Sequence, residues 1–94
     1  MKTEKDLQNA CMKFAKAEGG YARKVEATNY RGFPDCMVIT AKGRLFFTEF
    51  KTPAGTGKLM AGQTREIALL RFYGTEVHIL DNFDDFCTIY MGGT

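Results

Sequence analysis

Apolar side chains recur at helical spacing along the first part of the chain. Leu7, Cys11 and Phe14 lie three or four positions apart, as residues do on one face of an α-helix. Thr3, with an aspartate three residues later, resembles the start of a capping box, and the glycine pair at 19–20 is a typical helix stop. The pattern therefore predicts a helix over residues 3–18.

A period of two replaces the helical period after these glycines. Residues 21–27 alternate in a way that predicts a first strand, and the composition of residues 28–34 is that of a loop. Residues 35–40 and 44–51 are two further strand-like runs, joined by Ala41, Lys42 and Gly43. With Gly43 in the left-handed conformation, this junction fits a three-residue hairpin loop with a bulge.

The hairpin fixes which residues of the two strands lie opposite each other. A three-residue loop sets Thr40 opposite Arg44, and by the same count Asp35 opposite Glu49. Two carboxylates in that position have Cβ atoms about 5 Å apart. A two-residue Lys-Gly turn would shift the register by one residue and separate the acids, so both registers stay open at this point.

The second half of the chain predicts one more helix and one more strand. A glycine-containing loop over residues 52–58 precedes a helix over 59–73, which Gly74 closes; Leu59, Gln63, Ile67 and Leu70 share one stripe of it. Residues 75–80 alternate as a strand does. Residues 82–91 are compatible with a short helix followed by a strand, or with a strand alone.

These elements describe one α/β domain over residues 1–94, with a mixed sheet flanked by helices in the order αβββαβ. The strand after the second helix is expected to join the same sheet, through a right-handed crossover if it runs parallel to the strand before that helix. We find no internal repeat and no linker in the sequence.

Composition narrows the class of protein. Hydrophobic residues make up 45% of the 94 residues and charged residues 26%, which is ordinary for a globular domain and excludes a disordered tail or a fibre. The apolar runs are too short for a membrane span, and the N-terminus lacks the apolar core of a signal peptide. Three widely spaced cysteines without a CxxC pair argue against a disulfide framework or a zinc site. We therefore expect a cytoplasmic protein.

Charge is unevenly distributed along the chain. Residues 1–75 hold all 13 Lys and Arg against 7 acids, a balance of +6, whereas residues 76–94 hold 4 acids and neither basic type, a balance of −4. A basic body is compatible with a polyanionic partner such as nucleic acid. An ordinary solvated surface explains a modest excess of this size equally well.

The sharpest chemical feature is the pair Glu49 and Lys51, which share one face of a strand because they are two residues apart. A common interpretation of such a pair is a solvated surface. The apolar character of the rest of the strand, and the position of Asp35 on the same face, favour a site instead. Asp35, Glu49 and the backbone carbonyl of Phe50 offer three oxygens to a hard cation such as Mg²⁺. Lys51 would then orient a water and stabilise the charge that develops on a phosphate.

These residues resemble a known nuclease family. Gly32-Phe33-Pro34-Asp35, then Glu49-Phe50-Lys51, Gln63 and Gly74 are similar to the motifs of the PD-(D/E)XK nucleases. More narrowly, they resemble the small stand-alone VRR-NUC (virus-type replication-repair nuclease) domains. The resemblance extends from Glu4 to the strand around Val77.

The resemblance implies metal-dependent cleavage of phosphodiester bonds, with Mg²⁺ or Mn²⁺ as the cofactor. It makes Asp35 and Glu49 metal ligands, Lys51 the catalytic lysine, Gln63 a supporting residue and Glu4 a possible further acid. Two of these residues have simpler explanations. Glu4 is also well placed to interact with the dipole at a helix N-terminus, and Gln63 to cap a backbone group.

Several basic residues are candidates for phosphate contacts, although each is also explained by solubility alone: Arg23, Lys24, Arg31, Lys58 and Arg65. Gly55-Thr56-Gly57-Lys58 is not a nucleotide-binding loop, because Thr52 stands where the first glycine of that motif belongs and Leu59 replaces the Ser or Thr that binds magnesium. We therefore expect no nucleotide cofactor. The only histidine, His78, is interpreted as structural.

The leading hypothesis is a nuclease that acts on DNA as a homodimer, because a single small domain has one active site and cutting both strands requires two. The family favours branched DNA such as four-way (Holliday) junctions, and so compact a form suits a phage or its bacterial host. The alternative is a module of the same fold that binds nucleic acid without cutting it. A purely structural interaction protein is a third possibility.

Overall fold

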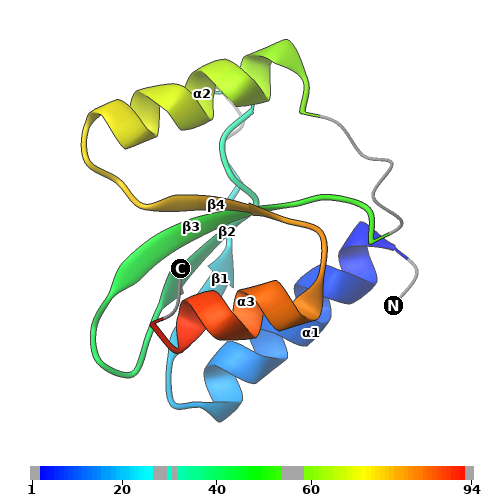
Figure 1. Ribbon diagram of the computed structural model, residues 1–94, viewed down its shortest axis with the longest axis vertical. Coiled ribbons are helices and arrows are strands. Elements are labelled where there is room, and N and C mark those ends of the chain that lie inside the picture. The colour runs from blue at the N-terminus through cyan, green and yellow to red at the C-terminus, as the bar shows by residue number, and fades with distance from the viewer. Residues whose placement is uncertain (1–2, 27–29, 31, 54–58, 93–94) are drawn as a thin grey trace.

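The computed structural model describes residues 3–26, 30, 32–53 and 59–92. Within these residues the chain forms three helices and four strands: α1 (Glu4–Ala17), β1 (Tyr21–Lys24), β2 (Cys36–Ile39), β3 (Leu45–Phe50), α2 (Ala61–Phe72), β4 (Val77–Leu80) and α3 (Phe83–Tyr90). Figure 1 shows α1 and α3 side by side on one face of the sheet and α2 on the other face. The predicted mixed α/β domain is confirmed, with a third helix added at its end.

The sheet has the order β1-β2-β3-β4. The first two pairings are antiparallel, and β3 pairs with β4 in parallel. Cys36 lies opposite Thr48, and the Thr40 N–H donates to the Arg44 carbonyl at 2.9 Å. This register confirms the three-residue loop and shows that the two-residue turn is wrong, and Gly43 within the loop has a φ of +91°. By this register Asp35 and Glu49 meet across the strand pair.

Local sequence signals determine where α1 begins and what it buries. The Thr3 hydroxyl oxygen accepts a hydrogen bond from the Asp6 N–H at 3.0 Å, as predicted for the cap. Leu7, Cys11 and Ala15 are fully buried. The helix thus covers the sheet with the stripe that its apolar spacing predicts.

Residues 81–92 contain a single helix, α3, so the strand predicted within residues 82–91 is wrong. Asn82 caps α3, with its side-chain oxygen accepting from the Asp85 N–H at 2.8 Å. Phe86, Ile89 and Tyr90 are buried against the core. These three residues are spaced by three and one, as on one face of a helix, although Phe, Ile and Tyr individually favour strands. Packing against α1 favours the helix over the strand.

The main core lies between the sheet and the pair of helices α1 and α3. Phe46 and Thr48 are fully buried, and Phe50 is 1% exposed, so alternate residues of β3 face this core. The opposite face of the sheet is covered by α2, where Ile67 and Val77 are buried. The predicted stripe of α2 is thus only partly realised, because Leu59 precedes the helix and is half-buried, as is Leu70.

The three cysteines are free thiols. Burial is the main cause that raises the pKa of both Cys11 and Cys36 to about 12, so both are protonated at neutral pH. In the part of the chain that the structure describes, no helix is long and apolar enough to cross a membrane.

An ion pair holds the hairpin to β4. Arg44 donates to both carboxylate oxygens of Glu76, at 3.0 and 2.6 Å, and to the Ile89 carbonyl at 2.8 Å. His78 bonds to the same carboxylate at 2.6 Å and packs its ring on Phe46, which agrees with a structural role. The hydrogen bond from Arg44 is the main cause that lowers the pKa of Glu76 to about 2.

Glu76→Gln is therefore expected to destabilise the protein by about 1 kcal/mol at pH 7, a value reduced for partial solvent screening. A folded-state pKa below the unfolded value of 4.5 gives stability that is present above pH 4.5 and is lost as the pH falls toward 2. Urea unfolding between pH 7 and pH 2 should show the difference between wild type and variant shrinking with acid. Equal stabilities at pH 7, or equal losses with Glu66→Gln, would contradict the prediction.

Candidate active site

Asp35 is held at the entrance to β2 by both its backbone and its side chain. Its carbonyl accepts from the Val25 N–H at 2.8 Å, and its Oδ2 accepts from the Phe50 N–H at 2.9 Å. Pro34, directly before it, is buried. The carboxylate of Asp35 is therefore fixed against the end of β3, beside Glu49.

Glu49 is buried, with only 2% of its surface exposed. Its Oε2 accepts from the Gln63 amide at 2.7 Å and lies 3.4 Å from the Lys51 ammonium, while Oε1 is buried without a hydrogen-bond partner. Burial and then the charge of Asp35 raise the pKa of Glu49 to about 7, against the opposing effect of Lys51. The interpretation of Glu49 and Lys51 as a solvated surface pair is wrong.

Gln63 connects α2 to this carboxylate and to the lysine. Its side-chain oxygen accepts from the Lys51 ammonium at 3.0 Å and from the Met60 N–H at 3.1 Å, while its amide donates to Glu49. Gln63 therefore caps the start of α2 and also orients two charged groups. The capping explanation for this residue is confirmed, and its supporting role in a reaction stays a prediction.

Glu4 interacts with the site through charge. It is exposed in the first turn of α1, and its negative charge adds a small upward contribution to the pKa of Glu49. The Phe50 N–H points toward Asp35, and its carbonyl points to the same side, because both groups of a strand residue face the same neighbour. The structure thus brings Asp35, Glu49, Lys51 and Gln63 together, with Phe50 and Glu4 at their margin.

The chemistry of these groups fits a hard divalent cation. Glu49 Oε1 is a buried acceptor with an unmet bond, and the repulsion among Glu49, Asp35 and Glu4 is what a cation would relieve. Over the described ranges no three histidine, cysteine or acidic side chains form a ready-made cage. A site of two carboxylates, completed by a backbone carbonyl, water and substrate oxygens, is typical of Mg²⁺.

A solved structure described as "VRR_NUC domain" is similar to this chain over 98% of both chains, with a TM-score of 0.84 and 26% sequence identity. The chain has the VRR-NUC fold. The predicted resemblance and fold class are therefore confirmed, and the similarity supports a nuclease-type domain. No family model matches the sequence, and no curated protein matches it significantly.

Basic residues proposed to contact phosphate lie on two elements of the VRR-NUC fold. Arg23 and Lys24 are exposed on β1, where the Arg23 guanidinium lies 4.1 Å from the centre of the Tyr21 ring, and Arg65 is exposed on α2. Arg31 and Lys58 lie outside the described residues. Phosphate contact at all five positions stays a prediction.

Sequence analysis missed Gln8 as a residue of this region. Burial raises the pKa of the Cys36 thiol, next to Asp35, and Gln8, which is 9% exposed on α1 one turn after Glu4, opposes that rise. The sequence did contain a signal for this position, because Gln8 is four residues after Glu4 and therefore lies on the same face of the helix.

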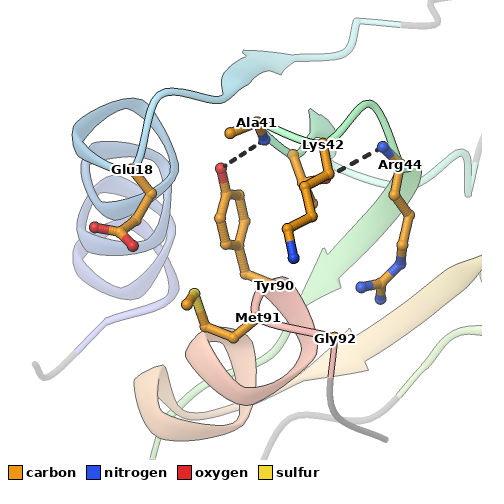
Figure 2. A pocket seen from close by; sticks show the side chains of 8 residues that line it. Glu18, Ala41, Lys42, Arg44, Tyr90, Met91 and Gly92 are labelled. Carbon is orange, nitrogen blue, oxygen red and sulfur yellow. Dashed lines mark hydrogen bonds between the residues drawn. The ribbon is translucent and has the colours of Figure 1, made fainter.

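A cavity of about 260 Å³ opens at the other end of the sheet, where the β2–β3 hairpin meets the ends of α1 and α3. Figure 2 shows Lys42 and Glu18 beside it, with the Tyr90 hydroxyl accepting a hydrogen bond from the Ala41 N–H. Asp35 and Glu49 lie at the opposite ends of β2 and β3. In this VRR-NUC fold the candidate active site therefore lies apart from this cavity.

Proposed function

We propose that this chain is a metal-dependent nuclease that hydrolyses phosphodiester bonds in DNA. The observation that carries the proposal is the carboxylate of Glu49, which is buried, has one unpartnered oxygen, and lies beside Asp35, Lys51 and Gln63. Burying an ionisable group without satisfying it costs stability. Such an arrangement is typical of a functional site.

Each residue has a distinct role in the proposed reaction. Asp35, Glu49 and the Phe50 carbonyl would hold Mg²⁺ or Mn²⁺, which polarises a phosphodiester and lowers the pKa of a bound water. Lys51 would stabilise the negative charge that develops on the phosphate in the transition state, and would orient the attacking water. Gln63 holds the Lys51 ammonium at 3.0 Å, so the lysine is already placed when substrate arrives.

We propose DNA as the substrate, with a preference for branched structures. The excess of basic residues in the first 75 positions supports a polyanionic partner, and exposed Arg23 and Lys24 on β1 are available to contact the backbone. The similar structure is described as a VRR_NUC domain, with no substrate named. Selectivity for four-way junctions is proposed because it matches a pair of sites in a dimer.

The outer face of α2 supports a homodimer. Ile67 is the buried residue of this helix, while Leu69, Phe72 and Tyr73 are 49%, 79% and 75% exposed. An exposed apolar cluster of this kind is typical of a surface that contacts another protein. Antiparallel pairing of two copies would set these large side chains against the small residues at the start of the helix, Ala61 and Gly62.

Phe72→Lys is expected to convert the dimer into a monomer, because it places a charge in an apolar interface. Light scattering after size exclusion should fall from twice the chain mass of 10.6 kDa to that mass. Leu45→Lys is the matched control, since Leu45 is 46% exposed at the start of β3. A monomeric wild type, or dissociation by both variants, would contradict the prediction.

The function itself is tested with labelled single-stranded, duplex, flap and four-way-junction DNA, each in Mg²⁺, Mn²⁺ or EDTA. We expect cutting in either metal, none in EDTA, and the fastest cutting of the junction. Binding without cutting in both metals would instead support the non-cleaving module. In that case Asp35→Asn should bind DNA as tightly as the wild type or more tightly, because one repulsive charge is removed.

A further inference from the structure

Gly32 makes the closest approach between the loop before β2 and the start of α2. Its φ is +89°, a conformation that residues with a side chain rarely adopt. A Cβ at this position would lie 2.6 Å from the carbonyl carbon and oxygen of Gly62 and from the nitrogen of Gln63. The α-carbon of Gly32 therefore rests on the peptide bond that joins Gly62 to Gln63.

The three residues after Gly32 are anchored to the sheet. The Phe33 ring packs edge-on against Phe47 at 5.5 Å, Pro34 is buried, and Asp35 accepts from the Phe50 N–H. Residues 32–35 thus form a strap, with one end on α2 and the other on β3. Because Gln63 belongs to α2 and Glu49 to β3, the strap spans the same two elements that the site connects.

We propose that Gly32 is a positioning residue that sets the start of α2 at the distance from β3 at which Gln63 reaches both Glu49 and Lys51. This inference rests on the proposed function for its catalytic consequence, although the positioning itself does not. Gly32 acts through the peptide bond before Gln63 and does not contact the substrate.

The size of the expected displacement follows from the contact. Ordinary contacts to a Cβ begin at 3.4 Å, so a methyl group at 2.6 Å requires the two segments to separate by about 0.8 Å if they move directly apart. A hydrogen bond of 2.7 Å between Gln63 and Glu49 would then reach about 3.5 Å, the limit of a useful bond. Misplacement of about 1 Å at an active site can cost roughly 100-fold in rate.

The chain contains controls that separate this contact from backbone strain. Gly43 and Gly74 have φ values of +91° and +87°, nearly that of Gly32, yet a Cβ on either would meet nothing within 4 Å. Alanine at all three positions imposes a similar conformational cost. Only alanine at position 32 also presses on α2.

The experiment compares Gly32→Ala with Gly43→Ala and Gly74→Ala by NMR and by steady-state cleavage. We expect Gly32→Ala alone to move the side-chain amide resonance of Gln63 and to speed hydrogen exchange at the Met60 N–H, which bonds to Gln63. We also expect its kcat to fall about 100-fold with little change in KM, and a further loss below 3-fold when Gln63 is already alanine. Unmoved Gln63 resonances, or a kcat equal to that of Gly43→Ala, would overturn the proposal.

Phe33→Leu provides a second test if Gly32→Ala does not fold. It loosens the strap without changing Gly32, and Phe83→Leu is its control, because Phe83 is a half-buried phenylalanine with one edge-on partner at 5.7 Å on the other face of the sheet. We expect only Phe33→Leu to move the Gln63 resonance, and equal effects would overturn the proposal. If the wild type does not cleave DNA, the proposed function fails, while the NMR comparison still decides the positioning.

Discussion

Glu49→Gln is expected to abolish cleavage and yet leave the protein at least as stable as the wild type at pH 8. The substitution removes the proposed metal ligand, so we expect a loss of at least 100-fold in kcat. It also removes a buried charge whose Oε1 has no partner. A residue maintained for stability alone would show the opposite outcome, because its replacement would weaken the fold.

The raised pKa of Glu49 also predicts how the stability of the wild type changes with pH. The folded-state pKa of Glu49 is raised from 4.5 to about 7, so the unfolded chain loses this proton at lower pH than the folded chain. Stability is therefore fully present below pH 4.5, declines as the pH rises to about 7, and is constant above it. The contribution of this group is roughly 3 kcal/mol at most.

Urea unfolding in EDTA, from pH 5 to pH 8, measures this decline in the wild type and in Glu49→Gln. The Glu49→Gln variant should not lose stability over this pH range. The control Glu66→Gln, on the same α2 helix as Gln63, should lose stability as the wild type does. A variant that loses stability at pH 8, or that cleaves DNA at the wild-type rate, would contradict the role given to Glu49.

Lys51→Ala is expected to lower kcat by roughly 100- to 1,000-fold, the usual cost of losing one donor that stabilises transition-state charge. Its KM should change little, because the ammonium is held by Gln63 and Glu49 inside the site and is not part of an exposed binding surface. Lys51→Arg should not restore the rate, since a planar guanidinium does not reproduce the position of a compact ammonium.

Single-turnover cleavage with excess enzyme, measured over a range of enzyme concentrations, separates the maximal rate of cleavage from the strength of DNA binding. Lys42→Ala is the matched control, because Lys42 is an exposed lysine in the hairpin at the other end of the sheet. A Lys51→Ala variant that keeps its maximal rate and only binds DNA more weakly would show that the lysine serves binding instead.

Local signals explain why the hairpin was predictable. Gly43 is the residue of its loop that adopts a positive φ, as a three-residue loop with a bulge requires, and this loop is the alternative that sets Asp35 opposite Glu49. The start of α1 at Thr3 and the end of α2 before Gly74 were predictable for the same reason, because each depends on residues that are neighbours in the sequence. The motif residues could be placed from sequence because two adjacent strands carry most of them.

Long-range packing accounts for what the sequence did not show. Helix α3 was predicted in part as a strand, because its aromatic and β-branched residues favour strands until α1 packs against them. The burial of Glu49 depends on α2 covering that face of the sheet. The contact of Gly32 with the bond before Gln63 joins residues thirty positions apart, which no local pattern reports.

Cleavage of labelled four-way-junction DNA by the wild type and by Asp35→Asn, in Mg²⁺ and again after EDTA, tests most directly whether this carboxylate pair forms a metal-dependent nuclease site. We predict cutting by the wild type in Mg²⁺, its loss in EDTA, its return when Mg²⁺ is restored in excess, and none by Asp35→Asn. Cutting that persists in EDTA, or that Asp35→Asn retains in full, would contradict the assignment of metal-dependent chemistry to Asp35 and Glu49.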